Sequence, residues 1–360
     1  MSDGPGNPLA PARVMRAGAV SVMVRPRAVA VGVVLVALCL LAAAIHLANG
    51  GTALPVDAVA RALLGDDSDT RVYLAVTELR APRTLAAIIA GACLAAAGAL
   101  TQTVARNPLA SPDILGVTAG SSLGAVSVVV LAGGGAAGLS GMASSVSLPV
   151  AAFAGGVLAG ALVYLLALSR SIDSYRLVLV GLGINGLAVS LTTWMLTLGD
   201  VTNAAQALTW MSGSLNGKDW PLVEPMAVLG MVLLAGALIL GRRSALLTLD
   251  DDVTTGLGVR VGWLRLTAFA LAALLASAGV VVAGPLVFVA LASPQIARLI
   301  TGSVTPPVLT SALVGIVFVL VADTVAANVL PVSLPAGVAT AVLGGPYLIF
   351  LVLRYQRRLA

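Results

Sequence analysis

Residues 28–48 read AVAVGVVLVALCLLAAAIHLA, a run of 21 positions without Asp, Glu, Lys or Arg. A helix rises about 1.5 Å per residue, so this run is long enough to cross a hydrocarbon core of about 30 Å. The apolar region of a secretory signal peptide is shorter, about 7–15 residues. The stretch therefore predicts an uncleaved first membrane span. Before it, residues 1–27 are rich in Gly and Pro and carry four arginines, which predicts a disordered basic tail.

The composition of the rest of the chain extends this conclusion. Of 360 residues, 59% are hydrophobic and 10% are charged, and the mean hydropathy is +1.04. Soluble domains carry about 25% charged residues, so a water-soluble globule is excluded. We expect an all-α integral membrane domain over 28–360, with a long outer loop at 49–81 and an inner segment at 241–263. Ten spans are predicted, at residues 28–48, 82–101, 114–132, 148–168, 177–198, 222–240, 264–283, 285–301, 308–326 and 336–353.

The basic residues indicate the orientation of these spans. If the N-terminus lies in the cytoplasm and the spans alternate, 15 basic residues fall inside and 5 outside. This asymmetry follows the positive-inside rule and places both termini in the cytoplasm. It also accounts for the net charge of +5 without a nucleic-acid partner. The outer basic residues are Arg61, Arg71, Arg80, Arg83 and Lys218.

Two short sequences recur about half a chain apart. Residues 94–98, LAAAG, match 275–279, LASAG, at an offset of 181, and 109–112 match 291–294, both LASP, at an offset of 182. The matching spans run in opposite directions in the predicted topology. The echo therefore predicts an inverted repeat of spans 2–5 and 7–10, a plan typical of transporters.

Several kinds of chemistry are missing from the sequence. A phosphate-binding P-loop needs Gly-Lys-Ser/Thr, but Asp219 follows Lys218, the one lysine. His46 is the one histidine and is expected near the outer membrane interface, which leaves no His-based metal site. We therefore expect no enzymatic activity, no cofactor and no metal. The acids nearest the spans, Glu224 and Asp323, are expected at outer span ends; this disfavours a gradient-driven secondary carrier, which stays an alternative.

Ordered motifs point to one family. Residues 80–86 (RAPRTLA), 106–116 (RNPLASPDILG), 210–215 (WMSGSL) and 343–347 (LGGPY) resemble the FecCD-type permeases of ABC importers for iron–siderophores, haem and vitamin B12. The resemblance implies a type II importer permease in a bacterial cytoplasmic membrane. It also implies a second permease copy or paralogue, two cytoplasmic ATPase subunits and an extracytoplasmic substrate-binding protein or lipoprotein. A ferric siderophore is the expected substrate, with haem or cobalamin as alternatives.

The resemblance also implies roles for individual residues. Arg80 and Arg83 match arginines that dock the binding protein, with anchoring of a helix end as the alternative. Asn107 and Leu109 match a cytoplasmic gate, with an ordinary Asn-Pro cap as the alternative. The segment that couples to the ATPase is expected to comprise Asp250, Asp251, Asp252, Gly256, Leu257 and Gly258.

Small and neutral polar side chains are expected to line the transport pathway. On the fifth predicted span Gly183 and Asn185 are candidates, and an interhelical hydrogen bond is the alternative role for Asn185. Gln102 and Gln295 complete the predicted lining. The chain departs from the family pattern at two positions: Gln295 stands where many members have histidine, and Ala327 where many have arginine.

Overall fold

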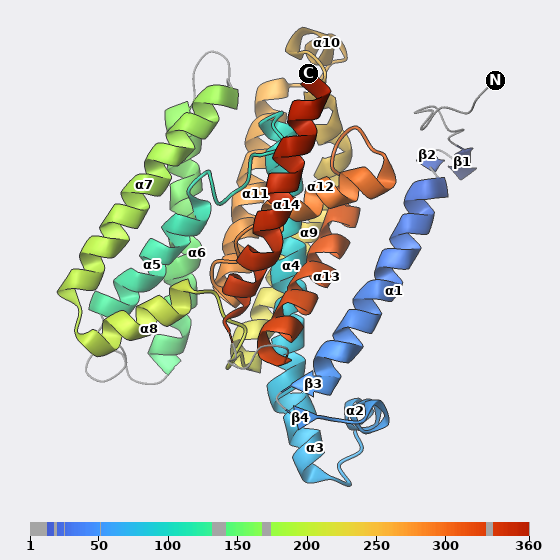
Figure 1. The fold of residues 1–360 in the computed structure, drawn as a ribbon. Helices are drawn as coiled ribbons and strands as arrows, with labels where there is room; N and C mark the ends of the chain where they lie inside the picture. Colours follow the sequence, from blue (N-terminus) through green and yellow to red (C-terminus); the bar gives the residue numbers. More distant parts are fainter. Residues whose placement is uncertain are drawn as a thin grey trace.

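The computed structural model describes residues 13–17, 20–24, 26–50, 52–131, 142–167, 174–328 and 334–359, and it is nearly all helical (Figure 1). Its strands form two short hairpins. The elements are β1 (Arg13–Ala17), β2 (Val20–Val24), α1 (Pro26–Ala48), β3 (Asn49–Gly50), β4 (Thr52–Ala53), α2 (Val56–Leu63), α3 (Thr70–Leu74), the π-helix η1 (Ala75–Arg80), α4 (Ala81–Val104), α5 (Val117–Leu131), α6 (Met142–Ala167), α7 (Ser174–Leu198), α8 (Val201–Met211), α9 (Trp220–Ser244), the 3₁₀ helix η2 (Ala245–Thr248), α10 (Asp251–Gly256), α11 (Val261–Ala283), α12 (Val289–Thr301), α13 (Val308–Asn328) and α14 (Ala336–Leu359).

Within the described residues, seven helical stretches are long and apolar enough to cross a membrane. They comprise α1, the continuous stretch from α3 to α4, α6, α7, α9, α11 and α13. Helices α5 and α12 and the apolar part of α14 lie at the other three predicted spans but are shorter. The multi-pass helical architecture is confirmed, and the count of ten spans stays a prediction.

Two predicted segments differ from the structure. Residues 49–81, expected as a loop, are largely helical, and the second span begins at Thr70 rather than 82. Asp69 caps this longer helix, because its carboxylate accepts hydrogen bonds from the backbone N–H groups of Arg71 and Val72. In the basic tail, where disorder is expected, β1 and β2 pair as an antiparallel hairpin; the recurring valines of this segment favour extended backbone.

Helix α4 is the centre of the bundle and packs against α9, α11, α12 and α13 (Figure 1). Small residues allow its backbone to approach theirs closely. A Cβ atom added to Gly98 would lie 1.7 Å from the carbonyl oxygen of Ala290 on α12, and one added to Gly91 would lie 2.4 Å from that of Gly315 on α13. Glycine is therefore required at both crossings.

The two halves of the chain share a backbone feature at the repeat offset. Arg106 and Phe288 are the non-glycine residues with positive φ in the described part, at 47° and 68°, and they are 182 positions apart. Each follows one of the antiparallel helices α4 and α11, which carry the first echo and pack side by side. The two copies of the LASP sequence differ in conformation. Residues 109–112 lie in the connection after α4, whereas residues 291–294 lie within α12.

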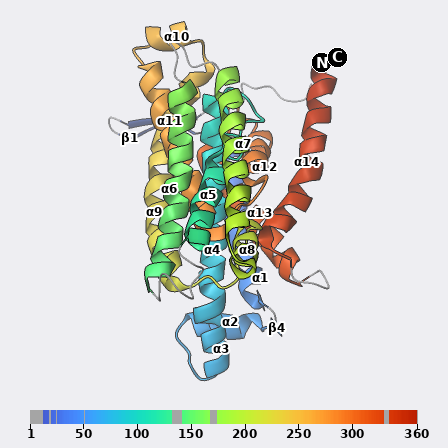
Figure 2. The ribbon, with the colours of Figure 1, turned by 90° about the vertical axis from the view of Figure 1, so that its left-hand side faces the viewer.

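The ends of the bundle differ in what they carry. Helix α10, the beginning of α1 and the end of α14 lie at one end, and α2 and α3 lie at the other (Figures 1 and 2). The predicted topology requires this grouping, since it assigns both termini and segment 241–263 to the same side of the membrane.

The Gly98 crossing provides a test of this packing. We expect Gly98→Ala to lower stability by about 1–3 kcal/mol, because the added methyl group collides with backbone that cannot move freely. Gly32→Ala on α1 is the matched control, since a Cβ there meets nothing within 4 Å. The measurement is the temperature at which each detergent-solubilised variant leaves its monodisperse size-exclusion peak. Equal temperatures for the two variants would contradict the role of Gly98.

Candidate functional site

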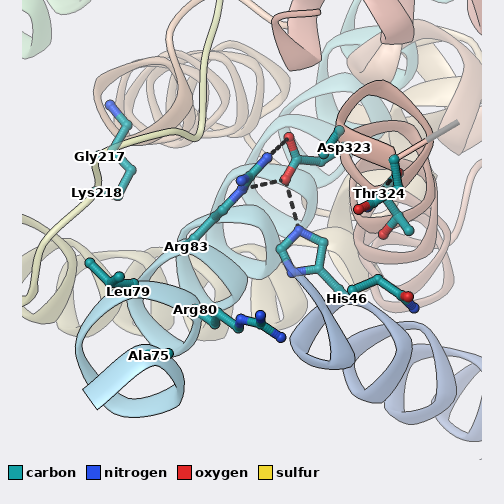
Figure 3. Close-up of a pocket in the computed structure, with 12 residues that line it drawn as sticks. His46, Ala75, Leu79, Arg80, Arg83, Gly217, Lys218, Asp323 and Thr324 are labelled. Atoms are coloured by element: carbon teal, nitrogen blue, oxygen red, sulfur yellow. Dashed lines mark hydrogen bonds and ion pairs between the residues drawn. The ribbon is translucent and has the colours of Figure 1, made fainter. Parts of the chain in front are cut away.

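A polar pocket of about 340 Å³ lies at the end of the bundle that carries α2 and α3 (Figure 3). It forms where the end of α1, the junction of η1 with α4, the connection before α9 and the end of α13 meet. Most of its ionisable side chains are basic. The polar and charged residues that line it are His46, Asn49, Arg80, Arg83, Lys218, Asp323, Thr324 and Asn328.

Asp323 is the centre of a buried ionic cluster in this pocket, and its side chain is 2% exposed. Arg83 binds both carboxylate oxygens, with Nε 2.8 Å from Oδ2 and Nη2 3.0 Å from Oδ1. His46 Nε2 lies 2.8 Å from Oδ2, and its Nδ1 lies 2.8 Å from the hydroxyl of Thr84. A carboxylate taken out of water needs such partners. The cluster therefore joins α1, α4 and α13.

Arg80, in contrast, binds the end of α1. Its guanidinium is buried and donates hydrogen bonds of 2.9 Å to the carbonyl oxygens of Leu47 and Ala48, at the C-terminus of α1. The last carbonyls of a helix have no partners within it, so Arg80 completes that helix end. Both predicted docking arginines thus line one pocket, and both guanidinium groups are bound within the chain.

The sequence interpretation missed other members of this site. Lys218 lines the pocket and forms no ion pair with any described residue. Burial lowers the pKa of Lys218, and nearby Asp219 offsets part of this effect. The sequence predicts His46 near the outer interface and Asp323 at an outer span end, but the structure buries them together. The signal for them was present, because an ionisable residue in a span needs a partner.

At the opposite end, Asp251 fastens α10 to the bundle. Arg265 of α11 binds it through two hydrogen bonds of 3.0 and 2.7 Å, and Nη2 of Arg106 lies 2.6 Å from Oδ1. Burial alone would raise the pKa of Asp251, but the hydrogen bonds from Arg265 and Arg106 outweigh it and hold the pKa below its ordinary value. Arg106 also donates to the carbonyl oxygens of Leu247 and Leu249.

The remaining residues of the predicted coupling segment face away from this clamp. Asp250 occupies the N-cap of α10, and Gly258, with φ of +80°, follows the end of the helix. Two apolar side chains, Val253 and Leu257, are more than half exposed beside them. The structure thus separates one internal anchor, Asp251, from an outward-facing surface. The exposed predicted coupling residues are Asp250, Asp252, Gly256, Leu257 and Gly258.

The predicted gate and part of the predicted pathway meet near α10. The side-chain oxygen of Asn107 accepts a hydrogen bond from the backbone of Leu109, the local turn of an Asn-Pro cap. Gln295 donates a 2.6 Å hydrogen bond to Gln102, which donates to the carbonyl oxygen of Leu291. Together with Asn107, both glutamines line a hollow of about 270 Å³.

The other two predicted pathway residues lie elsewhere. Gly183 and Asn185 are on α7 and do not line this hollow. Gly183 is exposed, and a Cβ added there would meet nothing within 4 Å. The backbone of Asn185 packs against Gly116, at the end of the connection that begins with the gate. The structure therefore brings Gln102, Gln295 and Asn107 together and leaves the α7 residues apart.

The fold is thus a multi-pass bundle with antiparallel central helices, a polar pocket at one end and a clamped short helix at the other. The FecCD transport family matches residues 35–354. The chain belongs to this family.

Individual relatives are similar to this chain over most of its length. The chain is 37% identical to the ferric enterobactin transport system permease protein FepG of Escherichia coli over 90% of this chain and 96% of that protein. It is 38% identical to the Fe(3+) dicitrate permease protein FecD of E. coli, over 82% and 91%, respectively. A solved metal-chelate type ABC transporter in an inward-facing conformation is 26% identical, with a TM-score of 0.78, over 91% of this chain and 99% of that one.

The clamp on α10 can be tested by hydrogen exchange. We expect Asp251→Asn to speed amide exchange across 252–258 about threefold to tenfold, because the variant loses the charge that both arginines bind. Asp252→Asn is the matched control, since Asp252 is exposed and forms no ion pair with any residue that the structure describes. Similar exchange in the two variants would contradict the clamp.

The pH dependence of the clamp has a defined sign. A lowered pKa in the folded state means that Asp251 stabilises the fold at pH values above the ordinary aspartate pKa of 3.8, and that this effect is lost as the pH falls through the lowered value. Protection of α10, corrected for intrinsic exchange, is therefore expected to stay constant from about pH 8 to about pH 5.

Proposed function

We propose that this chain is the membrane-spanning permease subunit of an ATP-driven importer that passes a ferric siderophore from an extracytoplasmic binding protein to the cytoplasm. The observation that carries the proposal is the 37% identity to FepG over 96% of that protein, whose name specifies ferric enterobactin. FecD is named for Fe(3+) dicitrate. These names favour a ferric complex over the haem and cobalamin alternatives.

The end that carries α10 is proposed to face the cytoplasm, together with both termini. Cytoplasmic ATPase subunits would bind the outward surface of α10 through Val253 and Leu257, which are exposed and apolar. Asp251 would pass their movement to Arg106. Because Arg106 directly precedes Asn107, a displacement of α10 would reach the predicted gate through one ion pair and one peptide bond.

The polar pocket at the other end is proposed to receive a carboxylate of the binding protein. Arg83 is neutralised by Asp323, and Arg80 is directed to the end of α1. These bonds support positioning roles for the two arginines, and they leave Lys218 as the cation best suited to an incoming acid. Ala327 lines the same pocket and adds no charge.

A second permease copy or a paralogue is proposed to complete the pathway. Helix α7 supports this assignment, because it presents Gly183 on an exposed face and carries Asn185 at its partly buried edge. A wall of small and neutral polar groups holds a bulky chelate weakly, and transport requires release as well as binding.

Transport itself is tested with radiolabelled ferric siderophore in a strain that lacks this chain. We expect the intact chain to restore uptake, ATP depletion to abolish it, and labelled haem and cobalamin not to enter. The deletion strain with an empty vector sets the background. Restored uptake of haem or cobalamin instead would overturn the substrate assignment, and uptake that survives ATP depletion would support the secondary-carrier alternative.

The docking pocket is tested by Lys218→Gln. We expect the affinity for the binding protein to fall severalfold at low salt, with a smaller difference at high salt, because ions screen the long-range attraction between a basic pocket and an acidic partner. Arg61→Gln is the control, since Arg61 is an outer basic residue of α2 that does not line the pocket. Equal affinities of the two variants at low salt, measured by surface binding kinetics, would refute the assignment.

A further inference from the structure

A groove of about 910 Å³ lies beside the cytoplasmic coupling region and takes no part in the proposed transport path. It runs between the end of α9, η2, the connection after α12 and the start of α13. A Cβ added to Gly241 would lie 2.6 Å from the side chain of Val308, so α9 and α13 approach closely at its floor. The residues that line it are Leu238, Ile239, Gly241, Arg242, Ala245, Thr248, Leu249, Ser303, Val304, Thr305, Pro306, Pro307, Val308 and Leu309.

The part of the groove that lies along the spans is apolar and exposed. The side chain of Ile239 is 71% exposed and that of Leu309 is 55% exposed. Leu238 of α9 also lines this part of the groove. Both helices belong to the apolar stretches long enough to cross the membrane. In a membrane these exposed apolar side chains would face lipid tails rather than water.

The other part of the groove is polar and basic. Arg242 lines it together with Thr248, Ser303 and Thr305. No Asp or Glu lines the groove, and Arg242 forms no ion pair within the part of the chain that the structure describes. The adjoining hollow shares Thr248 and Thr305 and adds two more arginines at its far side, Arg106 and Arg298.

We propose that this groove binds one anionic phospholipid of the inner leaflet. Arg242 and the neighbouring hydroxyl groups would hold the phosphate, and the acyl chains would lie along Ile239 and Leu309. Basic pockets at the cytoplasmic ends of membrane helices bind anionic head groups in this way. An inorganic phosphate ion would satisfy the polar part but would leave the larger apolar part uncovered.

The position of the groove gives the lipid a role in coupling. Thr248 and Leu249 form part of its wall and precede Asp250, the N-cap of α10. The carbonyl oxygen of Leu249 also accepts a hydrogen bond of 2.6 Å from Arg106, the residue that holds Asp251. A bound lipid would brace the segment through which α10 moves. The inference does not depend on which chelate the permease carries.

The test is native mass spectrometry of the purified full chain in detergent, with phosphatidylglycerol or phosphatidylcholine of identical acyl chains. We expect the wild type to retain phosphatidylglycerol preferentially and Arg242→Gln to bind it roughly fivefold more weakly, the effect of one basic residue near an anionic surface. Arg243→Gln is the matched control: Arg243 is the next residue, is also exposed and does not line the groove. Its affinity is expected to be unchanged.

Two further measurements make the outcome decisive. Arg242→Lys keeps the charge and is expected to retain the lipid, which separates loss of binding from loss of fold. Inorganic phosphate is expected not to displace phosphatidylglycerol. Equal losses in Arg242→Gln and Arg243→Gln, equal retention of the two lipids by the wild type, or displacement by inorganic phosphate would each overturn the proposal.

Discussion

The contact between Gly98 and the carbonyl group of Ala290 is the constraint on which the bundle depends. Pro294 has no N–H to donate to this carbonyl, four residues earlier in α12, and the oxygen lies against Gly98. A side chain at position 98 would push α12 away from α4. The Gln102–Gln295 hydrogen bond joins the same two helices about one turn further along α4, so it too depends on this close approach.

Helix α4 connects the two ends at which polar chemistry occurs. At one end, Arg83 binds Asp323. At the other, Arg106 follows the helix and binds Asp251. The segment between them is almost entirely buried among small and apolar residues. A rigid, close-packed rod of this kind can transmit a displacement between its ends, because packed interiors deform little.

The sequence predicted the multi-pass helical fold because the length of a hydrophobic run is a local signal. The polar residues of Thr70–Arg80 predict a loop, but the structure forms helix there, because Asp69 caps α3 and the π-helix η1 continues it into α4. His46, Thr84 and Asp323 are 38 and 239 residues apart along the chain and meet only through packing. The family resemblance assigns Asp251 to a predicted coupling segment, but only the structure shows that its two partners are the chain's own arginines.

The buried ionic cluster of His46, Arg83 and Asp323 bears on where the energy for transport enters the molecule. The sequence indicated a chain with almost nothing ionisable within the membrane, yet His46, Arg83 and Asp323 come together at one end of the bundle. His46 Nε2 and Arg83 Nε each lie 2.8 Å from the carboxylate of Asp323, and these contacts join three helices. Loss of the Arg83–Asp323 ion pair would leave the buried carboxylate without its cationic partner and would loosen the contact between α4 and α13. The cluster therefore serves the architecture. The proposed entry point for the work of transport is the other end of the bundle, where much of α10 is exposed and Asp251 binds Arg106, the residue before the predicted gate.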